Sequence, residues 1–134
     1  MDFRHFVFQT AGFQDSDVTR QQNVNEIEGH SLALWLSSQL KSACFNASDI
    51  WAEDHGWDFS LGHDSSKYLC ACSLAGDEEK PDEPRREGHV TLNKSRSLMD
   101  KLMGRNKLEP GDPVAAAIRA ALATHEAVQS LEEN

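Results

Sequence analysis

The segment from Asp49 to Asp64 concentrates side chains that can exchange protons. It carries five acidic residues and two histidines, with no lysine or arginine: Asp49, Glu53, Asp54, His55, Asp58, His63 and Asp64. Carboxylates beside an imidazole can perform general acid–base chemistry when their surroundings separate their pKa values. The structural alternative is that Glu53 and Asp54 cap a turn. In that case Asp58, which strand alternation places opposite Trp57, points to water.

A cysteine pair offers soft metal ligands, but its spacing argues against a metal site. Cys70 and Cys72 are two residues apart, so both point to the same face if this segment is a strand. Zinc ligands usually have a wider spacing that wraps a turn around the ion. We therefore expect both cysteines to behave as small hydrophobes, and we assign no metal, no cofactor and no catalytic residue. The sequence contains no Cys-x-x-Cys motif, nucleophile elbow or phosphate-binding glycine loop.

A basic segment follows between Lys94 and Lys107. Its five basic residues stand against Asp100 alone: Lys94, Arg96, Lys101, Arg105 and Lys107. On a helix, Lys94, Lys101 and Arg105 share one side and flank a stripe of leucine and methionine. Such an amphipathic basic helix can meet an acidic partner or nucleic acid. The alternative is a solvated face whose long side chains lie over the protein's own core.

Overall charge limits the choice of partner. The 134 residues include 22 acidic and 13 basic side chains, and the formal net charge is −9. A field of that sign repels phosphate backbones and anionic lipids, so nucleic acid is an unlikely partner. The chain has neither a signal peptide nor an apolar run long enough to span a membrane. With three cysteines that cannot all pair, these features predict a soluble cytoplasmic protein with free thiols.

The elements that position these side chains have recognisable patterns. Five segments have strand-like patterns: 3–9, 49–51, 57–62, 67–74 and 89–93. Segments 57–62 and 67–74 form the clearest β-hairpin. A helix is expected from His30 to Cys44, where one broad face is apolar. The polar residues 14–26 predict a loop, and the charged residues 76–88 predict a solvated, flexible one.

Two helices are expected after the last strand. Ser95 resembles an N-cap for a short helix with an apolar stripe, which consists of Leu98, Met99, Leu102 and Met103. Asp112 followed by Pro113 predicts the start of a final helix that reaches Val128, after which residues 132–134 fray. The chain is therefore expected to be one α+β domain, residues 1–134. Its antiparallel sheet should have three to five strands, with helices packed on one face.

The first 75 residues resemble a family of small uncharacterised bacterial proteins. The likeness rests on three segments: Thr10-Ala11-Gly12-Phe13, Leu34-Trp35-Leu36 and Glu53-Asp54-His55-Gly56-Trp57. The family shares a Gly-Phe pair after the first strand, a Trp-Leu helix, and an acidic-Gly-Trp turn that enters a β-hairpin. The resemblance implies an α+β fold and a bacterial origin. It implies no activity and transfers no functional residue.

The absence of catalytic signatures and the segregated charge predict a non-catalytic protein-interaction or adaptor module. Its binding residues would come from the acidic turn and the basic helix: Glu53, Asp54, His55, Trp57, Lys94, Lys101 and Arg105. Another protein is the expected partner. The alternative is a small-molecule binder or enzyme that uses Glu53, Asp54 and His55.

Overall fold

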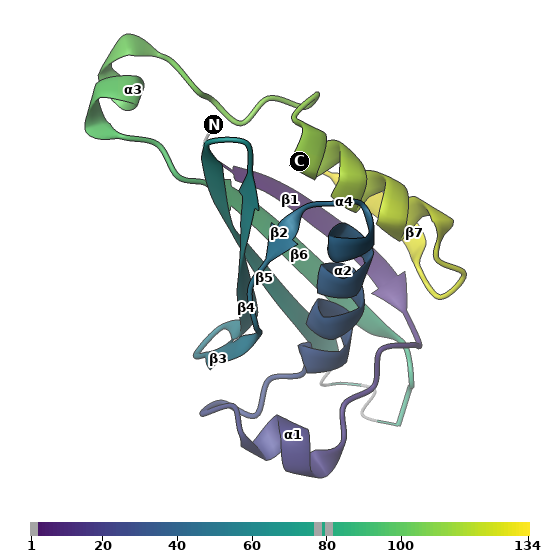
Figure 1. Cartoon of the computed structure of the whole chain (residues 1–134). Helices are drawn as coiled ribbons and strands as arrows, with labels where there is room; N and C mark the ends of the chain where they lie inside the picture. The colour runs from purple at the N-terminus through teal and green to yellow at the C-terminus, as the bar shows by residue number, and fades with distance from the viewer. Residues whose placement is uncertain (1–2, 77–78, 80–81) are drawn as a thin grey trace.

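The fold is an antiparallel sheet covered on one face by helices (Figure 1), which confirms the α+β class. The computed structural model describes residues 3–76, 79 and 82–134. Within these residues the strands are β1 (Phe3–Thr10), β2 (Asn46–Ala47), β3 (Trp51–Glu53), β4 (Gly56–His63), β5 (Ser66–Gly76), β6 (Arg86–Lys94) and β7 (Gln129–Glu133). Their order across the sheet is β2-β4-β5-β6-β1-β7, and β3 also pairs with β4.

Alternation along the long strands separates a buried face from an open face. The buried face carries Phe6, Phe8, Phe59, Leu61, Tyr68, Cys70, Cys72, Leu74, Val90 and Leu92. Two helices cover it, α2 (His30–Ser42) and α4 (Pro113–Thr124). Their contribution to the core is Leu32, Leu36, Leu40, Val114, Ile118 and Leu122. Figure 1 shows both helices on the same side, so the residues between the core positions lie on the open face.

Side-chain caps fix where the two long helices begin. The Asp15 carboxylate accepts hydrogen bonds from the backbone N–H groups of Gly29, His30 and Ser31 at 2.7–3.0 Å. Asp112 caps α4 by accepting from the N–H groups of Val114 and Ala115, which confirms the predicted helix start. These carboxylates satisfy backbone donors that have no partner inside the helix. None of the described helices is long and apolar enough to cross a lipid bilayer.

The carboxyl end of the chain differs from the prediction. The final helix ends at Thr124 rather than near Val128, and residues 129–133 form β7 beside β1 instead of fraying. Ion pairs explain the difference, because the carboxylate of Glu133 contacts Arg4 on β1 and Arg119 on α4. The predicted strand at 49–51 is found two residues later as β3. The two strands that were not expected, β2 and β7, bring the number from the predicted three to five to seven.

Two predicted loops also contain regular structure. A short helix, α1 (Asp17–Gln21), lies within the segment 14–26. Strand β6 already begins at Arg86, so 86–88 belong to the sheet rather than to the predicted loop 76–88. Residues 77–78 and 80–81 of that loop lie outside the described residues. The predicted hairpin is confirmed as β4 and β5, and Cys70 and Cys72 share its buried face.

Candidate functional site

The predicted binding residues do not form one surface. Glu53, Asp54 and His55 lie at the turn between β3 and β4, while Lys101 and Arg105 lie on and just after α3 (Leu98–Met103). Figure 1 shows β3 and α3 at opposite ends of the sheet. The acidic turn and the basic helix are therefore two separate surfaces.

Two of the predicted binding residues are structural. Trp57 is 4% exposed, and its indole N–H donates to the carbonyl oxygen of Ile27 at 2.9 Å. The Lys94 side chain is only 12% exposed, and its Nζ lies 3.6 Å from Oδ2 of Asp112. Both side chains point to the helix-covered face, so neither is available to a partner. Periodicity places a side chain on a face but does not show which face is covered.

At the acidic turn, the structure pairs His55 with a buried carboxylate. Asp58 is 2% exposed, so the expectation that it points to water is wrong. His55 Nε2 lies 2.8 Å from Asp58 Oδ1, and His55 Nδ1 lies 3.3 Å from Asp54 Oδ1. Desolvation alone would lower the pKa of His55, but hydrogen bonds and charges from Asp58 and Asp54 outweigh it and raise that pKa. Burial raises the pKa of Asp58, against the opposing effect of His55.

A second group of titratable side chains, linked by hydrogen bonds, lies on the open face of the sheet. His5 Nε2 lies 2.9 Å from Nδ1 of His89, and His89 Nε2 lies 2.8 Å from Oε1 of Glu87. The planes of the two imidazole rings are nearly parallel, with an interplanar angle of 17° and ring centroids 5.1 Å apart. Desolvation, followed by the charge of His89, lowers the pKa of His5, and Glu87 opposes this shift.

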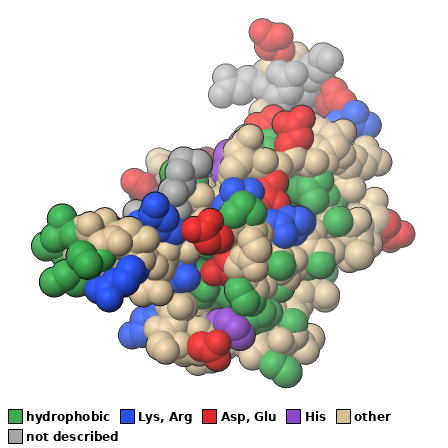
Figure 2. Space-filling view, turned by 90° about the horizontal axis from the view of Figure 1, so that it is seen from above, with side chains coloured by type: hydrophobic (Ala, Val, Ile, Leu, Met, Phe, Trp, Pro, Cys, Tyr) green, Lys and Arg blue, Asp and Glu red, His purple; other side chains and the backbone are tan. Residues whose placement is uncertain are grey.

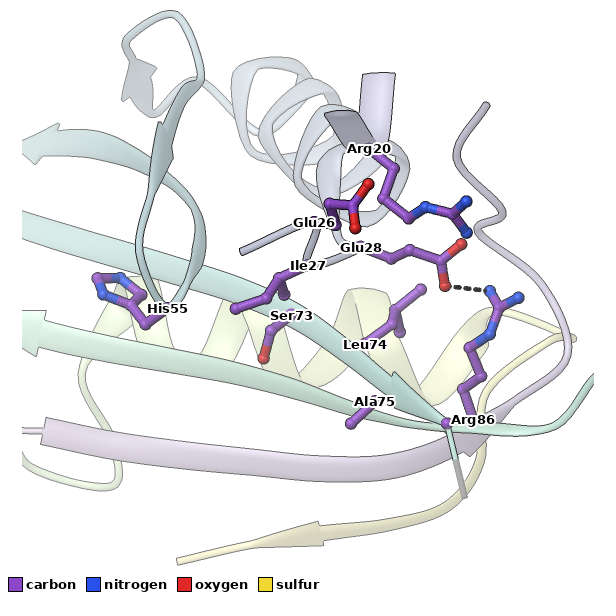
Figure 3. Close-up of a pocket in the computed structure, with 10 residues that line it drawn as sticks. Arg20, Glu26, Ile27, Glu28, His55, Ser73, Leu74, Ala75 and Arg86 are labelled. Carbon is purple, nitrogen blue, oxygen red and sulfur yellow. Dashed lines mark ion pairs between the residues drawn. The ribbon is translucent and has the colours of Figure 1, made fainter. Parts of the chain in front are cut away.

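Two clefts meet beside these groups. The larger, about 590 Å³, runs from His55 and Ser73 to Arg20, Glu28 and Arg86. Figure 3 shows the side chains of Arg20, Glu28 and Arg86 pointing toward one another, with His55 at the other end. Its cations are already neutralised, because Arg86 Nη1 lies 2.7 Å from Glu28 Oε2 and Arg20 is paired with Asp17. The Arg86 Nη1 contact is an ion pair whose N–H groups are not aligned for a hydrogen bond.

The smaller cleft, about 400 Å³, lies on the open face of the sheet. It shares His55 and Ser73 with the larger cleft and is also lined by His5, His89, Thr91 and Asn93. In the described part of the chain, no group of three His, Cys, Asp or Glu residues is placed to hold a metal ion. The polar side chains that line the cleft can donate and accept hydrogen bonds.

No family model, curated protein or solved structure matches the chain. The resemblance to small bacterial proteins consequently stays a prediction. The functional assignment rests on the side chains and their geometry alone.

The basic helix forms a projecting finger, which we define as residues 95–107. Its N-cap is Ser97 rather than the predicted Ser95, and a capping box joins Ser97 to Asp100. The apolar stripe of α3 does not pack on the core, because Leu98, Met99, Leu102 and Met103 are 74%, 58%, 74% and 63% exposed. Figure 2 shows hydrophobic and basic side chains gathered on the lobe at the left of the view. Leu108, which is 4% exposed, anchors the chain where it returns to the body.

Sequence reasoning missed the residues of the open face. Along β6 the polar residues Glu87, His89, Thr91 and Asn93 alternate with the buried residues Gly88, Val90 and Leu92. This alternation was available in the sequence as a signal for one polar face. The partner His5 was not, because β1 and β6 are brought together only by the sheet order.

Proposed function

We propose that the protein is a protein-interaction module that docks through the finger. The observation that carries the proposal is the exposure of four large apolar side chains, Leu98, Met99, Leu102 and Met103, on one short projecting helix. Exposed apolar side chains that cluster, rather than occur singly, are typical of binding surfaces. Lys101 and Arg105 retain their predicted binding role, since both are exposed on the same finger.

Local hydrogen bonds hold the shape of the finger. Asp100 N donates to Ser97 Oγ at 3.0 Å, while Gly104 ends α3 in the left-handed conformation at φ +66°. The Arg96 guanidinium donates to the carbonyl oxygens of Arg105 and Asp100 at 3.0 and 3.2 Å. A helix that is already formed loses less conformational entropy when a partner binds.

Charge indicates the kind of partner. The finger has four basic side chains, Arg96, Lys101, Arg105 and Lys107, against Asp100, in a chain whose net charge is −9. A protein groove with an apolar floor and an acidic rim complements both features, as in helix-in-groove recognition. An anionic bilayer fits less well, because the strongly acidic remainder of the chain would be repelled from it. A cytoplasmic location and a bacterial origin belong to this proposal.

Photocrosslinking in cells of the source organism tests the proposal. A photoreactive amino acid at Met103 should capture a defined protein, whereas the same group at Val24 should not, although Val24 is 81% exposed. Affinity for that protein should fall about tenfold or more in Leu102→Asp, as expected for an interface anchor. The matched variant Val24→Asp should bind normally.

Three results would count against this function. Equal capture from positions 103 and 24 would show that the finger has no special partner. Full affinity in Leu102→Asp would place the interface elsewhere. Binding of the wild type to phosphatidylserine vesicles, lost in Leu102→Asp, would assign the finger to a membrane instead of a protein.

A further inference from the structure

We propose that His5 is the general base of a second site, in the cleft on the open face of the sheet, that hydrolyses small uncharged esters. The site goes beyond the proposed docking function and uses none of the finger residues. Its machinery is the chain of hydrogen bonds from Glu87 through His89 to His5.

The hydrogen bonds determine which nitrogen of each imidazole ring carries the proton. An ionised carboxylate only accepts hydrogen bonds, so His89 must carry its proton on Nε2, which faces Glu87 Oε1 at 2.8 Å. Neutral His89 then has a lone pair on Nδ1 and accepts from His5 Nε2 at 2.9 Å. His5 consequently carries its proton on Nε2 and keeps a lone pair on Nδ1. No hydrogen bond to His5 Nδ1 is found among the described residues.

This arrangement suits a general base because the uptake of a proton by His5 breaks no existing hydrogen bond. A proton added at His5 Nδ1 leaves the bonds to His89 and Glu87 intact, and the carboxylate stabilises the new charge. The lowered pKa of His5 keeps the ring in its basic form at neutral pH. The other ionisable groups around His5 are His55 across the cleft and Glu132, which pairs with Val7 where β7 joins β1.

The cleft supplies the remaining polar groups. Thr91 is directly opposite His5 in the pairing of β1 with β6, so their side chains are neighbours on the open face. Asn93 and Ser73 also line the cleft, and its volume of about 400 Å³ can take a small molecule. The side-chain amide of Asn93 and the hydroxyl of Thr91 can donate to a carbonyl oxygen. Nearby carboxylates, Glu87 and Asp58, disfavour an anionic substrate.

The reaction needs water as its only co-reactant. His5 Nδ1 takes a proton from water while the water oxygen forms a bond to the ester carbonyl carbon. The resulting oxyanion accepts hydrogen bonds from the donors of the cleft. The bond from carbon to the alcohol oxygen then breaks, and protonated His5 returns its proton to that oxygen. The products are an alcohol and a carboxylic acid, and nothing is oxidised or reduced.

Hydrolysis of p-nitrophenyl acetate tests the site. Every protein in the assay carries Cys44→Ser, because the exposed thiol of Cys44 would react with this ester directly. His5→Gln should lower the rate about 100-fold, a typical contribution of a general base. His63→Gln is the matched control, since His63 is the last residue of β4 and lies outside the cleft. The reaction should also be slower in D₂O, because a proton moves in the rate-limiting step.

The pH dependence of the hydrolysis rate distinguishes a catalytic role of these hydrogen-bonded side chains from a structural role. The rate should rise with pH to a midpoint below 6.5, the ordinary value for histidine. Burial is the largest cause of the lowered pKa of His5, and the charge of Glu87 opposes it, so Glu87→Gln should move the midpoint further downward. A merely structural pair would alter folding without shifting the midpoint of the rate.

The proposal fails if His5→Gln, shown by circular dichroism to be folded, hydrolyses the ester as fast as its parent. It also fails if His63→Gln loses as much activity as His5→Gln. Should His5→Gln not fold, an NMR titration of the His5 ring in the parent protein decides. A midpoint at or above 6.5 would overturn the assignment of His5 as the base.

Discussion

The hydroxyl of Tyr68 donates a hydrogen bond to Oδ2 of Asp112 at 2.9 Å, across 44 positions of sequence. Oδ1 of the same carboxylate accepts from Val114 N at 2.8 Å at the start of α4. One side chain therefore joins the sheet to the helix that covers it. Burial and Asp112 together raise the pKa of Tyr68 to about 12, so the hydroxyl remains a donor at any ordinary pH.

We expect Asp112→Ala to lower the free energy of unfolding by about 3 kcal/mol. The loss combines a helix cap, worth about 1 kcal/mol, with a buried hydroxyl left without a partner. Urea denaturation measures the change. Tyr68→Phe keeps the cap and should cost roughly 1 kcal/mol. If the two changes are additive in the double variant, the hydrogen bond between them contributes nothing.

The pair of His55 and Asp58 predicts a pH dependence of stability. The pKa of His55 is raised in the folded state, so its contribution is complete below pH 6.5 and is lost as pH rises through the folded pKa. An NMR titration should place the His55 midpoint above 6.5. In Asp58→Asn the midpoint should fall, because the nearest carboxylate is gone. An unchanged midpoint would show that Asp58 does not control His55.

The carboxylate of Glu133 predicts the opposite pH dependence. Its hydrogen bonds with Arg119, and then with Arg4, lower its pKa below the ordinary value of 4.5. Its contribution to stability is therefore present above pH 4.5 and is lost as pH falls through the lowered pKa. Glu133→Ala should destabilise the protein by about 2 kcal/mol, the scale of a hydrogen bond to a charged group. The neighbour Glu132 is exposed, and Glu132→Ala is the matched control. Equal losses in thermal unfolding would contradict a specific role for Glu133.

Gly88 is required by the packing of the core. A Cβ atom at this position would lie 2.4 Å from ring atoms of Phe8, which is itself 1% exposed. Gly88→Ala should therefore cost about 1–3 kcal/mol, the range for overpacking a core. Gly111→Ala meets nothing within 4 Å and should be nearly neutral. A normal melting temperature for Gly88→Ala would show that the Phe8 ring moves aside easily.

Much of the fold follows from local sequence patterns. The alternation in 57–62 and 67–74 predicts the hairpin, and Asp112 before Pro113 predicts the start of α4. The end of α4 is not predictable in this way, because residues 125–128 continue the apolar pattern of the helix. What stops it is the pairing of β7 with β1, together with the ion pairs of Glu133, and these are tertiary interactions.

The candidate sites were only partly predictable. The sequence pointed to the chemistry of His55 but misjudged Asp58, since alternation does not show that a carboxylate is covered by its neighbours. It placed a basic amphipathic helix correctly near residue 101. It did not show that the apolar stripe of this helix faces away from the core. The link between His5 and His89 depends on strands 84 positions apart, which no local pattern joins.

The position of β1 between β6 and β7 has a consequence for biosynthesis. β1 is translated first, but both strands that flank it in the sheet are translated last. A nascent chain therefore cannot build its sheet strand by strand from the amino end. The backbone N–H and C=O groups of β1 stay without their sheet partners until residues 86–133 have left the ribosome. Unpaired strand edges promote association between chains. A ribosome that stalls before β6 and β7 are translated should therefore yield a product that associates with other chains.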